Sequence, residues 1–428
     1  MGKGEWGVRK EKLGVAGSWN LKIDLYGRRT ASIQLPDHAL YASPSLDGRA
    51  NHAAFHLFAI LLCASFGARP TIGAAYSVKD LGVEFIPLAI NERGQIAGEN
   101  SVAGPTTAFL LDGGVLTPIV PPGGDEVRVR AINNLGQVVG ASRDAVGNDH
   151  AYVWDTTSGW RNIEPPDVNY SFANGINDAR VIVGELFGAA TLWQTDGQII
   201  RLGHLGGQYS DAIAVNSAGD VVGLSALDLY GLQQHAFLWR QGAMQDLGVT
   251  DTITKGFQEY ALGRDINERG QVAGTAVGFD YSVGVYSAPY YGYIWDKSNG
   301  LQSLVPDVGF WAINDAGQAV GISSKNGLIT WNAMLYENGV LANLNDSISA
   351  TAGCHLMEAT GINNAGQIIA WGISADSSTH GYLLTPVPEP AQLWTVVAGL
   401  AVGSCLTRIR GRRLPVSFLA QTSSEKRF

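Results

Sequence analysis

The stretch Ala212-Ile213-Ala214-Val215-Asn216-Ser217-Ala218-Gly219-Asp220-Val221-Val222-Gly223-Leu224 decides the fold of this chain. Two short runs of small and β-branched apolar residues flank the four residues 216–219. Because Asn and Gly tolerate positive φ, such a segment between two β-rich runs predicts a tight hairpin. Nothing in the stretch has the length or the 3.6-residue period of an amphipathic helix.

The same phrase occurs seven times along the chain. In each copy an asparagine follows an apolar run, and Gly stands three residues later except in one copy, where Arg180 takes its place. The seven asparagines are Asn91, Asn133, Asn177, Asn216, Asn267, Asn314 and Asn363. Successive copies lie 39 to 51 residues apart, and a regular spacing of this length indicates a repeat architecture.

Each repeat contains four short β-rich runs. After the hairpin around Asn216, residues 235–239 (His-Ala-Phe-Leu-Trp) form a third run and residues 244–247 a fourth. The last repeat ends near Leu384 without a fourth run, whereas residues 76–82, before the first repeat, resemble one. We therefore expect the N-terminal strand to complete the last repeat.

Seven repeats of four β-rich runs each predict an all-β fold over residues 76–386, a seven-bladed β-propeller of four-stranded blades. The N-terminal strand would close the ring, which leaves no exposed sheet edge at the seam. An open β-solenoid is the alternative, but it would not explain why one fourth strand is missing and another is spare.

The repeats resemble the HAF repeat of exported bacterial proteins, which is named for the residues that stand here as His235-Ala236-Phe237. The resemblance covers roughly residues 76 to 385. The histidine is present in three copies, as His150, His235 and His380. We expect these histidines, the repeated asparagines and the tryptophans of the third runs to be structural rather than functional.

Residues 51–75 are typical of a secretory signal peptide. A short apolar stretch follows Arg49 and His52, and Gly73-Ala74-Ala75 is suited to cleavage before Tyr76. A buried core helix is the alternative for this stretch. Residues 1–50 would then be either the result of a start codon placed too early or an unstructured leader.

The C-terminal residues 387–413 resemble the PEP-CTERM sorting signal of Gram-negative bacteria. Prolines end the preceding strand, an apolar stretch at 393–403 follows, and arginines hold its end on the cytoplasmic side. The residues that match the signal are Pro388, Glu389, Pro390, Arg408, Arg410, Arg412 and Arg413. In that family an exosortase is thought to cut near the Pro-Glu-Pro. The tail 414–428 departs from the pattern, and a plain membrane anchor is the alternative.

Charge and cysteine content narrow the classes of function. The whole chain carries a net charge of −9, but residues 76–390 contain 14 Lys and Arg against 32 Asp and Glu, a net of −18. So acidic a domain repels phosphate backbones, which argues against a nucleic-acid partner. Of three cysteines, the propeller region holds only Cys354, so an internal disulfide cannot stabilise it.

The uneven loops on one face of the predicted propeller are the place where a ligand would bind. Their aromatic residues form the candidate ligand face, with carboxylates such as Glu259, Asp280 and Glu358 among them. Aromatic rings beside carboxylates suit the binding of carbohydrate. The alternative is that the rings pack the long loops against the blades. The candidate residues are Phe257, Tyr260, Phe279, Tyr281, Tyr286, Tyr290 and Trp311.

We therefore interpret the chain as an exported cell-surface or extracellular-matrix protein, a propeller scaffold for binding or structural interaction. Its expected partners are a signal peptidase, an exosortase-type enzyme and, transiently, the inner membrane, with exopolysaccharide or other surface proteins as further partners. A polysaccharide-binding module is one alternative, and a polysaccharide lyase or glycoside hydrolase is the other. No catalytic motif, metal-ligand pattern or cofactor motif occurs, so the sequence names no catalytic residue and no cofactor.

Overall fold

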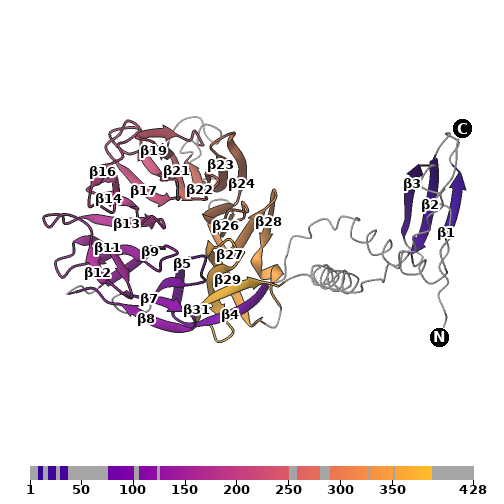
Figure 1. The fold of residues 1–428 in the computed structure, drawn as a ribbon, viewed down its shortest axis with the longest axis horizontal. Coiled ribbons are helices and arrows are strands. Elements are labelled where there is room, and N and C mark those ends of the chain that lie inside the picture. Colours follow the sequence, from indigo (N-terminus) through magenta and orange to yellow (C-terminus); the bar gives the residue numbers. More distant parts are fainter. Residues whose placement is uncertain are drawn as a thin grey trace, which may run out of the picture. The chain divides into compact units, whose positions relative to one another are not determined.

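The computed structural model describes residues 8–12, 18–25, 29–36, 76–100, 106–122, 126–249, 258–279, 290–325, 328–349 and 352–387 (Figure 1). The chain divides into two compact units, Met1–Pro70 and Thr71–Phe428. Within the described ranges, the secondary structure consists of strands and one short 3-10 helix, η4 (Leu344–Ser347). The all-β prediction is confirmed.

The first unit contains a three-stranded antiparallel sheet. Its strands, β1 (Val8–Lys12), β2 (Ser18–Leu25) and β3 (Arg29–Pro36), pair in chain order. In β2 the apolar residues Leu21, Ile23 and Leu25 alternate with polar ones, which is the period of a strand. The sheet lies in residues 1–50, for which a start codon placed too early or an unstructured leader stays a prediction.

The second unit begins with three antiparallel sheets of four consecutive strands each, and we call each such set of four strands a blade. The first blade contains β5 (Phe85–Ile90), β6 (Ile96–Asn100), β7 (Thr107–Asp112) and β8 (Val115–Ile119). The second contains β9 (Glu126–Ile132), β10 (Val138–Arg143), β11 (Asp149–Asp155) and β12 (Gly159–Asn162). The third contains β13 (Ser171–Ile176), β14 (Ile182–Leu186), β15 (Ala189–Trp193) and β16 (Ile199–Arg201).

The next two blades join into one eight-stranded sheet through a short parallel pairing of β19 with β21. One half contains β17 (Ser210–Val215), β18 (Val221–Ala226), β19 (Gln233–Arg240) and β20 (Ala243–Asp246). The other half contains β21 (Gln258–Ile266), β22 (Gln271–Phe279), β23 (Tyr290–Asp296) and β24 (Gly300–Pro306).

Two further four-stranded sheets complete the unit. One contains β25 (Val308–Ile313), β26 (Ala319–Lys325), β27 (Leu328–Glu337) and β28 (Val340–Asn343). The other contains β29 (Cys354–Ile362), β30 (Ile368–Ser374), β31 (Thr379–Pro386) and, on its outer edge, β4 (Tyr76–Val83). Figure 1 shows the blades around a common centre. The domain is thus an all-β propeller with four-stranded blades.

The repeated asparagines lie in the turns between the first and second strands, and each connects two blades. In the turn at Asn133, the side-chain Oδ1 accepts hydrogen bonds from the backbone N–H groups of Leu135 and Gln137, as predicted for a turn-forming asparagine. Its Nδ2 donates to the carbonyl of Asn177 in the next blade at 3.1 Å. All seven asparagines donate in this way at 2.9 to 3.3 Å, and the series returns from Asn363 to Asn91.

A β-bulge interrupts the first strand of each blade three residues before the repeated asparagine. In the second blade Val139 pairs with Ala131 and Gly140 with Val129, so that Arg130 has no partner. The bulge brings the first-strand backbone so close to the second strand that a Cβ on Gly140 would lie 1.9 Å from the carbonyl oxygen of Arg128. Glycine at this position of the second strand therefore makes the bulge possible.

The strand β4 joins the two ends of the propeller domain. It pairs antiparallel with β31, and Asp80 accepts a hydrogen bond from Nδ1 of His380 at 2.8 Å. The last and first blades also adjoin, because Oγ1 of Thr360 donates to the carbonyl of Pro87 at 2.7 Å. An open solenoid would separate its first and last repeats, so this contact excludes that alternative.

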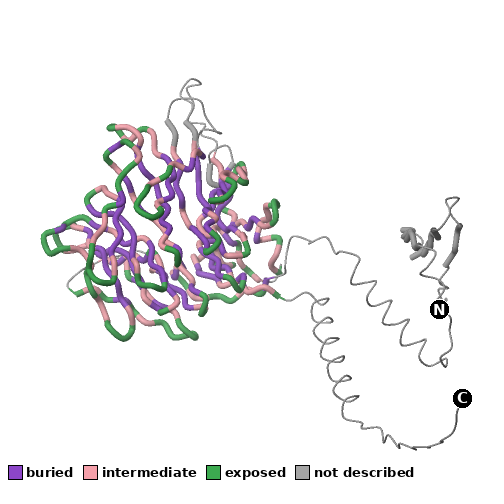
Figure 2. The backbone as a smooth tube through the Cα atoms, turned by 45° about the horizontal axis from the view of Figure 1, so that its top comes forward, coloured by how far each residue is buried: buried purple, intermediate pink, exposed green. Residues whose placement is uncertain are grey.

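The hydrophobic core lies between successive blades. Trp154 of the second blade packs with Ala97 and Leu110 of the first, and Trp193 of the third packs with Val139 of the second. The tryptophans of the third strands are therefore core residues, as predicted. Figure 2 shows buried residues along the strands and exposed residues concentrated in the turns.

Several predicted segments lie outside the described residues. These are the signal peptide at 51–75, the Pro-Glu-Pro segment with its arginines, and the tail at 414–428. Within the ranges that the structure describes, no helix has the length and apolar character to cross a membrane.

The bulge can be tested with Gly223, whose Cβ would lie 1.9 Å from the carbonyl oxygen of Asp211. We expect Gly223→Ala to lower the free energy of unfolding by about 2 kcal/mol or more, because backbone cannot move aside as a side chain would. The control is Gly219→Asn, since Gly219 has a φ of +78° and open space around it, and Asn tolerates that conformation. Urea denaturation that showed equal losses of the free energy of unfolding for both variants would contradict this role of glycine at the bulge.

Candidate functional site

A cavity of about 700 Å³ lies at the centre of the propeller domain, and we call it the central cavity. The first strands of all the blades, β5, β9, β13, β17, β21, β25 and β29, form its wall. The seven unpaired bulge residues all belong to this wall. They are Leu88, Arg130, Asn174, Ile213, Arg264, Trp311 and Thr360.

At the bulge, the side chains of the first strand divide into those that pack between blades and one that faces the cavity. Val129, on one side of Arg130, is 1% exposed and packs between blades, whereas Arg130 itself is exposed. A β-bulge re-aims one side chain without ending the strand pairing. Each blade thereby presents one variable side chain to the cavity, while its neighbours keep the apolar pattern.

Two arginines face the central cavity without an ion-pair partner among the residues that the structure describes. The guanidinium carbon of Arg264 lies 4.3 Å from the ring centroid of Trp311, which is a cation–π contact. Its Nε is buried and makes no hydrogen bond. Burial lowers the pKa of Arg264, but an arginine side chain stays charged in proteins. Among the described residues, neither Arg264 nor Arg130 forms an ion pair.

Asp211 is the most perturbed acid of the cavity wall. Its Oδ1 accepts a hydrogen bond from Nδ2 of Asn174 at 2.8 Å. Burial, reinforced by the charge of Glu185, raises the pKa of Asp211 to about 8. Glu185 in turn accepts from the hydroxyl of Tyr209 at 3.2 Å, and burial raises its pKa as well. The Asp211 carboxyl group is therefore mainly neutral at pH 7.

Two further carboxyl groups of the wall are occupied by protein donors. Asp265 accepts from the backbone N–H of Ile313 in the next blade at 2.9 Å and from that of Ile266 at 2.8 Å. Burial raises the pKa of Asp265 to about 6. Glu358 accepts from Nε1 of Trp371 at 2.9 Å, and burial raises its pKa too. Burial thus favours the neutral form of each acid, while the arginines keep their charge.

The structure describes only part of the predicted ligand face. Tyr260 and Trp311 line the central cavity. Tyr290 begins β23 and packs beside Gly309, where an added Cβ would lie 2.6 Å from its ring. Phe279 ends β22. Phe257, Tyr281, Tyr286 and Asp280 lie outside the described residues, so the face as a whole stays a prediction.

Arg130, Asn174, Asp211 and Arg264 were not predicted as site residues, because they lie in the first strands of their blades and not in the long loops. One signal could have found most of them. The position three residues before the repeated asparagine varies in size and charge from copy to copy, although apolar residues surround it. A variable position inside an otherwise uniform strand indicates a side chain that leaves the core.

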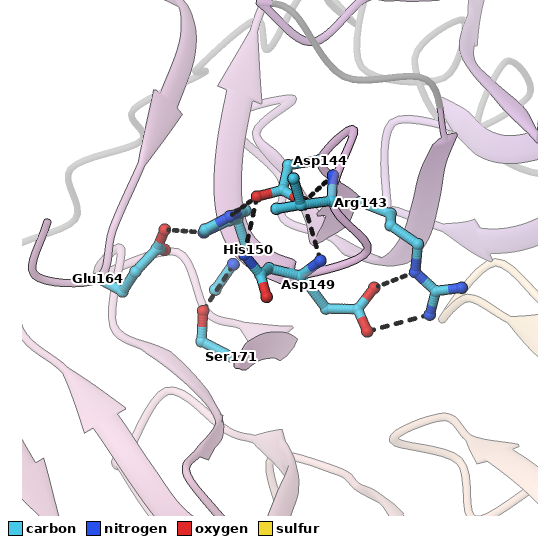
Figure 3. A network of polar contacts seen from close by, with 9 residues as sticks. Arg143, Asp144, Asp149, His150, Glu164 and Ser171 are labelled. Carbon is cyan, nitrogen blue, oxygen red and sulfur yellow. Dashed lines mark hydrogen bonds and ion pairs between the residues drawn. The ribbon is translucent and has the colours of Figure 1, made fainter. Parts of the chain in front are cut away.

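The three histidines of the repeat act as structural links, as we expected. His235 contacts Asp246 of the outer strand β20 at 2.7 Å, and His380 contacts Asp80 of β4. Figure 3 shows the third case, in which His150 lies between Glu164 at 3.0 Å and Asp144 at 3.2 Å. No group of side chains able to hold a metal ion occurs within the described part of the chain.

No family model matches the chain, and no curated protein matches it either. Among solved structures, TolB from Acinetobacter baumannii is 11% identical, with a TM-score of 0.38 over 89% of this chain and 79% of that one.

Two other solved structures are similar to the same degree. The β-propeller domain of the Trilobed protease from Pyrococcus furiosus is 11% identical, with a TM-score of 0.43 over 75% of this chain and 98% of that one. YCF48 bound to D1 peptide is 12% identical, with a TM-score of 0.42 over 74% and 96%. Similarity at this level carries no information about a ligand or an activity.

The raised pKa of Asp211 predicts a pH-dependent stability. Because the folded state binds this proton more tightly than the unfolded chain, its stabilising effect is complete below about pH 4 and is lost as the pH rises through about 8. We expect the wild-type melting temperature to fall by at least about 2 °C more than that of Asp211→Asn between acidic and alkaline pH. The exposed control Asp196→Asn should follow the wild type. Parallel curves for wild type and Asp211→Asn would contradict the prediction.

Proposed function

We propose that this chain is an exported surface or matrix protein whose closed, seven-bladed propeller binds a saccharide in the central cavity. The ring of seven asparagine hydrogen bonds and the position of β4 support the closed seven-bladed form. The protein would act as a binding scaffold, with the central cavity as its binding site.

The observation that carries the saccharide proposal is the composition of the cavity wall. Tyr209, Tyr260 and Trp311 offer aromatic surface, and Asn174 and Arg264 offer polar groups beside it. Sugars present apolar C–H faces to aromatic rings and hydroxyl groups to planar polar side chains. A cavity of about 700 Å³ is also within the range that proteins use for small ligands.

The export part of the proposal rests on the sequence signals. The apolar stretch within residues 51–75 and the order of Pro388-Glu389-Pro390, apolar stretch and arginines are typical of exported proteins with a HAF repeat and a PEP-CTERM signal. A signal peptidase and an exosortase-type enzyme would process the two ends, and the C-terminal stretch would lie in the inner membrane until then. The acidic charge of the propeller suits a soluble state after release.

A lyase or glycoside hydrolase on the same propeller is the second candidate function. Asp211 favours it, because a carboxyl group that is neutral at pH 7 in a ligand cavity is able to act as a general acid. Incubation with exopolysaccharides would separate the two candidates. New reducing ends or unsaturated products that disappear with Asp211→Asn support an enzyme, and their absence supports a binder.

We expect the purified protein to bind an immobilised glycan panel, and Trp311→Ala to weaken that binding by roughly tenfold or more, because a stacking surface is lost. The control is Tyr230→Ala, since Tyr230 is 86% exposed in a turn away from the cavity wall. Thermal melting confirms that both variants fold. Equal glycan binding by the two variants would place the site elsewhere.

Mass spectrometry of the protein recovered from cells and from medium tests the export proposal. We expect a new N-terminus near Tyr76 and, for released protein, a new C-terminus near Pro388. Substitution of Glu389 by Gln should leave the N-terminal cut unchanged and abolish the C-terminal one. Recovery of the intact chain from both fractions would rule out processing at both ends.

A further inference from the structure

The hydrogen-bonding capacity of the central cavity is unbalanced. Each of its carboxyl groups already has a protein donor: Asn174 for Asp211, two backbone N–H groups for Asp265, and Trp371 for Glu358. The guanidinium groups of Arg264 and Arg130 have no acceptor among the described residues. The cavity therefore has cationic donors whose hydrogen bonds no described protein acceptor takes up.

The two arginines line the same cavity, and the charge of Arg130 contributes to lowering the pKa of Arg264. Arg130 comes from β9 and Arg264 from β21, which are three blades apart in the circle of seven asparagine contacts. The two side chains thus project from different sides of the same cavity wall. Both lie at the bulge position, at equal distance along the strand from the asparagine ring, so they stand at one level of the cavity.

Arg130 and Arg264 lie in a domain whose net charge is opposite to their own. The surrounding domain carries a net charge of −18, so exposed anions are repelled from most of its surface. Arg264 is held in place by its stacking on Trp311. A half-buried guanidinium group without a hydrogen-bond acceptor costs free energy to maintain, and a bound anion would supply that acceptor through bidentate hydrogen bonds.

We infer that the central cavity selects a carboxylate-bearing saccharide, whose uronate group lies between Arg130 and Arg264 while a sugar face stacks on Trp311. The inference rests on the proposed saccharide function and names its substrate class. A single carboxylate fits better than a sulfate-rich chain, because Arg130 and Arg264 are the cationic residues among those that line the cavity and cannot match several sulfate groups.

Calorimetric titration of the full-length protein tests the inference with defined probes. The acidic probes are oligogalacturonate and oligomannuronate. The matched neutral probes are the same oligomers after carboxyl reduction, and a sulfated oligosaccharide without carboxylates is the third arm. We expect an acidic probe to bind, its reduced form to bind roughly tenfold or more weakly, and added salt to weaken only the acidic probe.

Variants assign the effect to the two arginines. Arg264→Gln and Arg130→Gln should each weaken binding of the acidic probe by roughly ten- to a hundredfold and change binding of the neutral probe little. Arg264→Lys should restore part of the affinity, because it keeps the charge but loses the planar fork. The matched control is Arg201→Gln, since Arg201 is exposed at the end of β16. Arg130→Gln still tests the inference if a variant at the half-buried Arg264 fails to fold.

The outcomes distinguish the inference from the proposed function. Binding of neutral and acidic probes with equal affinity, or unchanged acidic binding in both Gln variants, overturns the uronate inference and leaves the saccharide proposal standing. Tighter binding of the sulfated probe overturns the choice of carboxylate. Binding of no probe in any arm overturns both the inference and the saccharide proposal.

Discussion

The rest of the structure depends on one hydrogen bond that each repeated asparagine makes to the next blade. One end of the amide closes the turn between the first and second strands, and the other end donates to the carbonyl of the next asparagine. Because an unsatisfied buried amide is destabilising by about 1–3 kcal/mol, every copy requires a successor, and only a closed circle supplies one to the last. The bond from Asn363 to Asn91 completes that circle at 3.2 Å.

The asparagine circle also positions the candidate site. It holds the ends of the first strands at one level, so the bulges three residues earlier lie at one level too. Glycine in the second strand, such as Gly140, gives the displaced backbone its space. The repeat thus keeps its apolar and turn residues constant for folding, and one position in each blade remains free to vary.

The two arginines of the cavity wall and the domain as a whole carry charges of opposite sign. Most of the charge of the domain is negative and lies outside the cavity, whereas Arg130 and Arg264 remain cationic within it. Burial neutralises Asp211 in part, and hydrogen bonds occupy Asp265 and Glu358. The cavity therefore combines two cationic side chains with carboxyl groups whose pKa values burial raises, a combination that neither composition nor net charge reveals.

Several features could be predicted from the sequence alone. They are the repeat, the four strands of each blade, the supply of the last outer strand by residues 76–82, and the structural roles of asparagine, histidine and tryptophan. Periodicity and turn chemistry act over a few residues, so they can be recognised without coordinates. The folded structure alone shows that Arg130, Asp211 and Arg264 share a cavity, and that the first strands form its wall. These residues lie 53 to 134 positions apart, and it is the closure of the ring that brings them together.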